Sequence, residues 1–319
     1  MIDPVRPIAI EDIESARDKI AGTVLRIPLV KLDLGPGSPD IRLKLENLQP
    51  TNAYKIRGAM NAVARLSQDE RARGVWTISA GNAGQGVAYA ARKLGIPCTV
   101  VAIETAPKTK LERMRALGAT IVPVAYDRAW VAAESHEFAG LDGTFVHPFD
   151  NYDFIAGHGT MGLEILEDCP DVQTVICAVG GGGLITAVGS AIKARRPSAK
   201  VLGAEPETAA PFALSLRENR PSKFENWQAS FVDGAGGMSV SERMWTRMRP
   251  VTDGSITVTL DEVRSAMRLI ADKTRTIAEG AGSLALAAAL TGQAGEGPIV
   301  CVVSGGNIDL GKFAELVAS

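Results

Sequence analysis

The stretch TVICAVGGGGLITAVGSAIKAR, residues 174–195, decides the fold of this chain. A short apolar, β-rich segment at 174–179 meets four consecutive glycines at 180–183, and an amphipathic helical pattern begins at Leu184. A strand that turns through bare backbone into a helix directs unpaired N–H groups and the positive end of a helix dipole at one point. Such a point suits a phosphate group, and the glycines indicate that something approaches the backbone closely.

The motif argues against two common nucleotide sites. A Walker A loop ends in Gly-Lys-Ser/Thr, whereas the residues after this glycine run contain no lysine before Lys193. The dinucleotide fingerprint Gly-x-Gly-x-x-Gly lacks its third glycine, although Glu205 stands about where a ribose-binding acid would. A nicotinamide enzyme is therefore disfavoured. A tight βα turn without a ligand stays open as the plain alternative.

Composition narrows the class of protein. The chain has 319 residues, enough for two domains, and a formal net charge of −2. Without a basic stripe or an apolar run of membrane-span length, it is not expected to bind nucleic acid or membranes. The N-terminal segment lacks the pattern of a secretory signal, so we expect a cytoplasmic protein. The four cysteines and three histidines have no metal-ligand spacing, and we expect reduced, buried thiols and no metal site.

Strand-like and helix-like segments alternate along almost the whole chain. This alternation predicts an α/β fold of two units, each a mostly parallel, twisted sheet flanked by helices, with residues 147–157 crossing between them. The strand-like segments are residues 42–46, 75–78, 98–103, 120–124, 174–179, 200–205 and 298–304. The helix-like segments are residues 57–68, 84–94, 107–117, 128–138, 157–167, 184–195, 261–273 and 282–291. The pattern of residues 211–250 is the least readable.

Polar and glycine-rich loops follow several of the predicted strands. In parallel α/β sheets, ligands bind beyond the carboxyl ends of the strands. Loops that are distant in sequence can therefore line one cleft. These loops are residues 79–86, 179–183, 204–207 and 304–307.

A phosphate loop without a nucleotide fingerprint leaves phosphosugars, phosphate ions and phosphate-bearing cofactors as ligands. Pyridoxal phosphate also requires a lysine that forms a Schiff base. Lys55 is the candidate, because it follows a strand-like segment and begins an apolar helical one in NLQPTNAYKIRGAMNAV. The helix dipole disfavours a lysine at the start of a helix, so the position of Lys55 indicates a functional role. A solvated first-turn lysine is the plain alternative.

At these residues the chain resembles the serine/threonine dehydratases, pyridoxal-phosphate enzymes of fold type II. The resemblance runs from about residue 20 to about residue 310. It rests on four ordered motifs: Lys55-Ile56-Arg57-Gly58-Ala59, Ser79-Ala80-Gly81-Asn82, Gly180 to Gly183, and Ser304-Gly305-Gly306-Asn307. It implies a fold like that of the tryptophan synthase β subunit. A large cofactor-binding domain would comprise residues 1–70 and 148–319, and a small mobile domain residues 71–147. A homo-oligomer, as a dimer, is implied by analogy.

The resemblance also implies a role for each motif. Lys55 would form the Schiff base and, once released, remove the Cα proton of the substrate. The remaining cofactor contacts would come from Asn82 at the ring hydroxyl, Gly180, Gly181, Gly182, Gly183 and Leu184 at the phosphate, Ser304 at the ring nitrogen, and Glu279 in the pocket wall. The substrate would bind at Ser79, Ala80, Gly81, Asn82 and Ala83, beside Tyr54.

Departures from the family pattern bear on the substrate. Tyr54 follows Ala53 where the family has Ser-Phe, and Ala83 replaces a His or similar residue, which would admit a larger or differently charged side chain. Ala80 stands where related racemases carry the serine that acts as a second base, so racemisation is disfavoured. His158 stands where relatives often have Gln, and we expect it to hydrogen-bond a neighbour.

A divalent cation site is also expected to be absent. Some relatives bind a cation through a Glu and an Asp, and Glu205 matches the first of these. Pro211, however, stands at the position expected for the Asp.

The resemblance implies β-elimination from a β-hydroxy amino acid to a 2-oxo acid and ammonia. Threonine or serine is the expected substrate, and 3-hydroxyaspartate or phenylserine are further candidates. A β-replacement enzyme of the cysteine synthase type and a non-catalytic small-molecule-binding relative are the alternatives.

Overall fold

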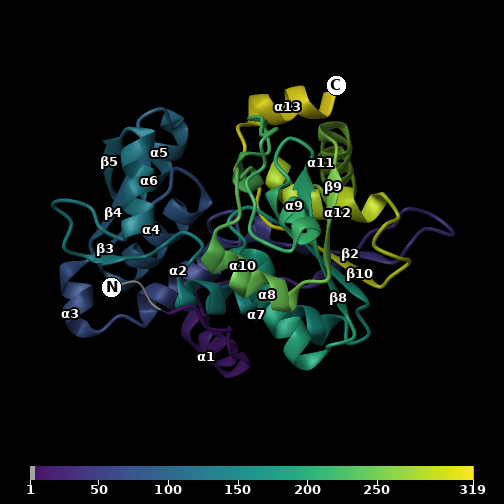
Figure 1. Cartoon of the computed structure of the whole chain (residues 1–319), viewed down its shortest axis with the longest axis horizontal. Coiled ribbons are helices and arrows are strands. Elements are labelled where there is room, and N and C mark those ends of the chain that lie inside the picture. Colours follow the sequence, from purple (N-terminus) through teal and green to yellow (C-terminus); the bar gives the residue numbers. More distant parts are fainter. Residues whose placement is uncertain (1–3, 319) are drawn as a thin grey trace.

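The computed structural model describes residues 4–318, whose strands form two sheets (Figure 1). The strands are β1 (Leu29–Lys31), β2 (Ile41–Leu45), β3 (Val75–Ile78), β4 (Cys98–Ile103), β5 (Thr120–Val124), β6 (Thr144–Phe145), β7 (Thr174–Ala178), β8 (Lys200–Pro206), β9 (Gly254–Val258) and β10 (Ile299–Val303). The six-stranded sheet has the order β1-β2-β10-β7-β8-β9, and the four-stranded sheet the order β5-β4-β3-β6. Among the named strands of the described residues, only the β1–β2 pairing is antiparallel.

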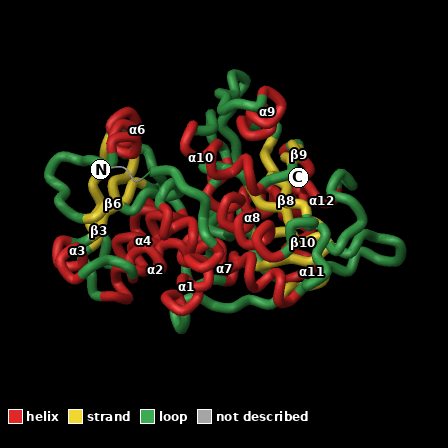
Figure 2. The backbone as a smooth tube through the Cα atoms, turned by 60° about the horizontal axis from the view of Figure 1, so that its bottom comes forward, coloured by secondary structure: helices red, strands yellow, loops and turns green. Residues whose placement is uncertain are grey.

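Helices cover both faces of each sheet (Figure 2). The helices are α1 (Ile10–Ile20), α2 (Lys55–Ala64), α3 (Gln68–Arg73), α4 (Asn82–Leu94), α5 (Lys108–Ala116), α6 (Tyr126–Ser135), α7 (Tyr152–Asp168), α8 (Gly183–Arg195), α9 (Pro211–Glu218), α10 (Glu242–Met248), α11 (Leu260–Thr274), α12 (Gly280–Leu290) and α13 (Leu310–Ala318). Short 3₁₀ turns are η1 (Glu46–Leu48), η2 (Asp233–Ala235) and η3 (Arg249–Val251).

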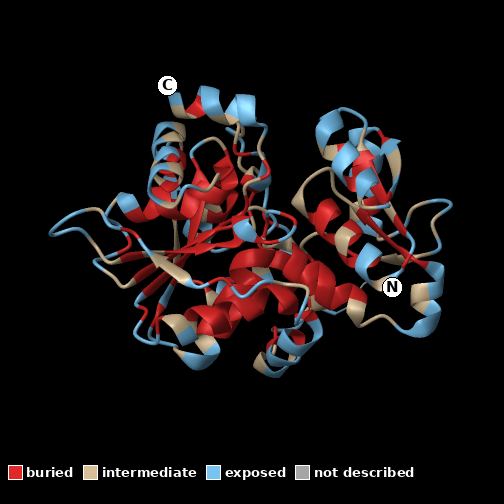
Figure 3. Ribbon diagram, turned by 180° about the vertical axis from the view of Figure 1, so that it is seen from behind, coloured by how far each residue is buried: buried red, intermediate tan, exposed pale blue. Residues whose placement is uncertain are grey.

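The large sheet has an apolar core on each face because its strands alternate which way their side chains point. In β7, Ile176 and Ala178 join the core beneath α11 and α12, whereas Val175 and Cys177 join the core beneath α7 and α8. Helix α12 is apolar all round and buried from Gly280 to Ala289, as expected of a helix enclosed by protein (Figure 3).

The smaller sheet and its helices form a distinct lobe. We call residues 75–145 the small lobe and the rest of the described chain the large lobe. Residues 146–151 connect β6 to α7, at the segment predicted to cross between units (Figure 1). That residues 71–147 form a separate mobile domain stays a prediction.

The structure confirms the predicted α/β class with mostly parallel sheets. Seven of the eight predicted helices begin one to five residues earlier than predicted; α2 begins at Lys55 rather than at residue 57, and the largest difference is at α7, which begins at Tyr152 rather than at 157. The start of α7 is capped by the Asn151 side chain, which accepts a hydrogen bond from the Phe154 N–H.

Several elements escaped the sequence patterns. They are β1, β6, β9, α1, α3, α9, α10 and α13. The strands among them are two to five residues long, which is too short for a clear period. The unreadable region 211–250 contains α9, η2 and α10, each at most eight residues long.

All four cysteines are buried and free, as expected. No helix among residues 4–318 is long and apolar enough to cross a membrane.

Candidate active site

A cleft of about 520 Å³ lies between the two lobes. It is lined from the small lobe by the loop after β3 and by residues before and within α5, and from the large lobe by α2 and the loops after β7 and β10. A smaller cavity of about 40 Å³ shares Tyr54, Lys55 and Ser304 with the cleft. Loops 79–86, 179–183 and 304–307 therefore contribute to one cleft, as their positions at strand ends predicted.

Every predicted site residue lines one of these two cavities. The cleft is lined by Tyr54, Lys55, Ser79, Ala80, Gly81, Asn82, Ala83, Gly180, Gly181, Glu279 and Ser304. Gly182, Gly183 and Leu184 line the smaller cavity. Sequence reasoning missed other lining residues, including Pro148, Phe149, Lys110 and Asp233. The glycine-rich DGAGG at 233–237 was the one signal that could have found the last of these.

Lys55 is the first residue of α2, and the amine faces the cleft. Its Nζ donates to the Pro148 carbonyl oxygen at 2.7 Å and lies 5.1 Å and 5.4 Å from the ring centroids of Tyr54 and Phe154. Burial lowers the pKa of Lys55 from 10.5 to about 7. A substantial fraction of such an amine is neutral at physiological pH, as a nucleophile or base requires.

Arg57 holds the first turn of α2 in place. Its buried guanidinium donates to both carboxylate oxygens of Glu46 at 2.8 Å, and to both of Glu164 at 2.7 and 2.8 Å. Lys44 also donates to Glu164, so two cations and two carboxylates balance in a buried cluster. The cluster ties the start of α2, and with it Lys55, to the end of β2 and to α7.

His158 contacts the same turn from α7. Its Nδ1 accepts a hydrogen bond from the Gly58 N–H at 3.1 Å, which agrees with the expected bond to a neighbour. Its ring lies 4.6 Å from that of Tyr54 and 4.8 Å from that of Phe154. Burial holds the pKa of His158 well below 6.5, so the ring is neutral beside the lysine.

The glycine run forms the turn between β7 and α8, as predicted. Gly182 precedes the helix with φ of +84°, a conformation that glycine adopts without strain. A Cβ on Gly181 would stand 2.4 Å from the Phe149 ring, and one on Gly182 would stand 2.3 Å from the sulfur of Met248. The first N–H groups of α8 have no acceptor within their own helix, so the loop presents them to the smaller cavity.

The second glycine loop begins α4 and presents further N–H groups to the cleft. Ser79 Oγ accepts from the Gly81 N–H at 3.1 Å, which fixes the bend before the helix. Asn82 is the first residue of α4, and Ala83 is buried beside it. The helix terminus here suits a carboxylate for the same reason that the other suits a phosphate.

Asn82 is more constrained than the sequence suggested. Its Oδ1 accepts from Asn307 Nδ2 at 2.8 Å, and its Nδ2 donates to Glu279 Oε1 at 2.7 Å. One N–H of the amide is left for a ligand. Glu279 is buried at the start of α12, and burial raises the pKa of its carboxyl group to about 7.

Ser304 directly follows β10, and its buried side chain lies at the edge of both cavities. Its carbonyl oxygen accepts from the Tyr54 N–H at 3.0 Å, which brings the end of β10 against the start of α2.

The loop at 204–207 does not belong to this site, contrary to the prediction. Its residues line neither cavity. The Glu205 carboxylate instead accepts from the N–H groups of Phe212 and Ala213, at the start of α9, and from Ser255 Oγ, each at 2.7 Å. Among residues 4–318, no cluster of three or more His, Cys, Asp or Glu side chains is placed to hold a metal ion.

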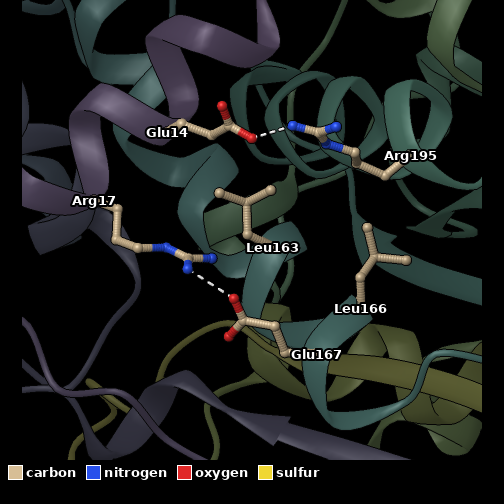
Figure 4. A pocket seen from close by; sticks show the side chains of 6 residues that line it. All are labelled: Glu14, Arg17, Leu163, Leu166, Glu167 and Arg195. Atoms are coloured by element: carbon tan, nitrogen blue, oxygen red, sulfur yellow. Dashed lines mark hydrogen bonds and ion pairs between the residues drawn. The ribbon is translucent and has the colours of Figure 1, made fainter.

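A second depression of about 440 Å³ lies among α1, α7 and α8 (Figure 4). Its apolar floor is Leu163 and Leu166, flanked by ion pairs of Arg17 with Glu167 and of Arg195 with Glu14. None of its lining residues lines the cleft, and it brings no reactive groups together.

Comparisons with known proteins agree with this geometry. A family model described as pyridoxal-phosphate dependent enzyme matches residues 20–305. The chain is 39% identical over 318 residues to L-threonine ammonia-lyase of Thermotoga maritima, which covers 97% of this chain and 78% of that protein. A solved threonine deaminase from T.th. is 34% identical with a TM-score of 0.83, covering 95% of this chain and 99% of that one. Serine racemase from Dictyostelium discoideum is 31% identical with a TM-score of 0.86, covering 95% and 99%.

Proposed function

The chain belongs to the pyridoxal-phosphate-dependent enzymes, and from this premise we propose that it removes water from threonine or serine and releases a 2-oxo acid and ammonia. It is a pyridoxal-phosphate-dependent ammonia-lyase, as its likeness to ammonia-lyases and dehydratases shows. The choice of substrate is the proposal. The observation that carries the proposed chemistry is the meeting of Lys55 and the glycine loop in adjoining cavities, whereas the substrate is supported by the names of relatives.

The residues present fit this cofactor. The loop of Gly180 to Gly183 leaves a small cavity at the start of α8 with backbone N–H groups around it, which suits a phosphate. Lys55 lines the same cavity and carries an amine of lowered pKa, which suits Schiff-base formation. When bound, pyridoxal phosphate draws electrons away from the bonds at the α-carbon of the substrate.

Lys55 is proposed to take the α-proton. With a pKa of about 7, the amine accepts a proton at neutral pH without becoming so basic that it stays charged. The rings of Tyr54 and Phe154 flank the amine, and the cluster around Arg57 fixes the turn that carries it.

The other predicted residues would bind and orient the substrate and the cofactor. The loop from Ser79 to Ala83 would hold the substrate carboxylate at the start of α4. Ser304 would face the ring nitrogen with a hydroxyl, which does not force a proton onto that nitrogen as a carboxylate would. A weaker electron sink of this kind favours loss of a β-hydroxyl over reactions that need a long-lived carbanion.

Threonine is supported by the names of relatives, one a threonine ammonia-lyase and one a threonine deaminase. The likeness to a serine racemase keeps serine as a candidate. Ala83 in place of a larger residue, with Lys110 in the cleft wall, keeps 3-hydroxyaspartate and phenylserine in the panel. A homo-oligomer and a cytoplasmic location stay predictions.

The test is a substrate panel. Purified protein loaded with pyridoxal phosphate is assayed for 2-oxo acid release from threonine, serine, 3-hydroxyaspartate and phenylserine, with and without sulfide. We expect release from threonine or serine without added nucleophile, and Lys55→Ala should lose both the visible absorption band and turnover. A new thiol product that forms only with sulfide, which replaces the β-hydroxyl as it leaves, would indicate β-replacement instead. A protein that never takes up the cofactor would refute the assignment.

A further inference from the structure

Side chains from the two lobes meet in the wall of the cleft, where Asn82 and Glu279 both line it. Asn82, in the small lobe, accepts a hydrogen bond from Asn307 and donates one to Glu279, both in the large lobe. Asn307 also donates to the Thr51 carbonyl oxygen at 2.8 Å and accepts from Arg113 at 3.0 Å. These contacts form one continuous polar chain across the gap between the lobes.

These hydrogen bonds determine the orientation of the Asn82 amide. If the amide were flipped, its oxygen would face the Glu279 carboxylate and its nitrogen would face the donor of Asn307. Both contacts would be lost. In the observed orientation one N–H of Nδ2 is left over, no described residue accepts it, and Asn82 lines the cleft.

Glu279 is placed to hold this amide and little else. It is 6% exposed at the start of α12 and accepts from Asn82 Nδ2 and from the Asn307 backbone N–H. No described cation forms a hydrogen bond or ion pair with it. A Cβ on Gly305 would stand 2.5 Å from its Oε1, so the backbone packs directly against the carboxylate.

Three titratable groups face Glu279 from the elements around it. Asp233 in η2 raises its pKa and Lys110 in α5 lowers it, and these two form an ion pair at 2.8 Å. Tyr54 faces it from the start of α2. Burial is the largest influence and raises the pKa of Glu279 to about 7, so the carboxylate titrates near neutrality.

We propose that Glu279 is a positioning residue that acts through Asn82. Its carboxylate fixes the amide so that the remaining N–H is available to an oxygen of the ligand in the cleft. Because Asn82 belongs to the small lobe and its two partners to the large lobe, this donor is aligned only while the lobes are together. The inference rests on the proposed function, since it takes the ligand to be the cofactor and its substrate.

A consequence follows for pH. As the pH falls through about 7, Glu279 gains a proton and becomes a weaker acceptor for the Asn82 amide. The alignment of that amide is then relaxed. The signature of the bound cofactor should therefore change over this range in the wild type and should lose this component when the carboxylate is removed.

The experiment compares the wild type with two variants and a matched control. Glu279→Gln keeps a carbonyl acceptor but removes the charge, and Glu279→Ala removes both. Glu262→Gln is the control, because Glu262 is an exposed acid at the start of α11 whose capping contact an amide can also make. Each protein is loaded with pyridoxal phosphate, and we measure the visible spectrum against pH, the cofactor dissociation constant, kcat, KM and the melting temperature.

We expect Glu279→Ala to lower kcat about tenfold or more, with KM changed less than about threefold. Glu279→Gln should show a smaller loss of kcat and a visible spectrum without the pH component near 7. The control should match the wild type in spectrum and kcat.

Two results would overturn the inference while leaving the enzyme assignment intact. In the first, the wild type takes up the cofactor and both Glu279 variants reproduce its spectrum at every pH and its kcat. In the second, the variants lose melting temperature and activity together while the spectrum keeps its pH dependence, which would mean a merely structural role. A wild type that takes up no pyridoxal phosphate would instead refute the proposed function, and the inference with it.

Discussion

Replacing the candidate Schiff-base lysine should stabilise the cofactor-free protein. Lys55 has a pKa of about 7 instead of 10.5, which corresponds to about 4 kcal/mol of unfavourable charge burial at pH 7. Lys55→Met removes this cost and places an unbranched apolar side chain beside the rings of Tyr54 and Phe154. It also removes the hydrogen bond to the Pro148 carbonyl, worth about 1 kcal/mol. Lys55→Met should therefore raise the free energy of unfolding by about 3 kcal/mol.

The extra stability of Lys55→Met should decrease as the pH rises. The folded-state pKa lies below the unfolded-state value, so between pH 7 and 10.5 the unfolded chain binds more protons and wild-type stability rises with pH. The penalty is fully present below pH 7 and absent above 10.5. The advantage of Lys55→Met should therefore shrink as the pH rises through this window.

Thermal unfolding of the cofactor-free proteins at pH 7 and pH 9.5 measures the difference in stability between Lys55→Met and the wild type. For a chain of 319 residues, about 3 kcal/mol raises Tm by about 4–5 °C at pH 7. Lys273→Met, at an exposed position of α11, is the control and should leave Tm within about 1 °C. A Lys55→Met protein no more stable than the wild type at pH 7, or equally stabilised at both pH values, would refute the argument that this amine is buried at a cost.

Three further predictions concern other parts of the site. Arg57→Met should cost about 3–5 kcal/mol in urea unfolding, because buried Glu46 loses its counter-ion and Glu164 keeps only Lys44; a midpoint like that of the wild type would contradict a buried cluster. Gly181→Ala should weaken pyridoxal phosphate binding about tenfold in a fluorescence titration, because its Cβ would stand 2.4 Å from the Phe149 ring and displace the loop. Ala80→Ser should add measurable racemisation of serine in chiral chromatography, and its absence would show that a serine there is not sufficient as a second base.

Local features of the sequence predicted much of the site. The glycine run between an apolar strand and a helix predicted the turn from β7 to α8, and Lys55 before an apolar pattern predicted the lysine at the start of α2. These predictions succeeded because a turn or a helix start depends on residues within a few positions of each other. The short elements of region 211–250 were missed because so few residues show no period.

Contacts between distant segments could not be predicted in the same way. The partners of Arg57 are 11 and 107 residues away, and Asn82 meets Glu279 across 197 positions. The loop at 204–207 was wrongly placed in the cleft. Its position at the end of a strand does not show which neighbouring groups form hydrogen bonds with the Glu205 carboxylate.

By itself, the sequence determined the α/β class, the glycine turn before α8 and the lysine at the start of α2, because each depends on local backbone chemistry. Only the tertiary structure decided the pKa of that lysine, the orientation of Asn82 and the near-neutral pKa of Glu279. These properties arise from burial and from charges brought close by segments far apart in the chain, and no local pattern encodes that environment.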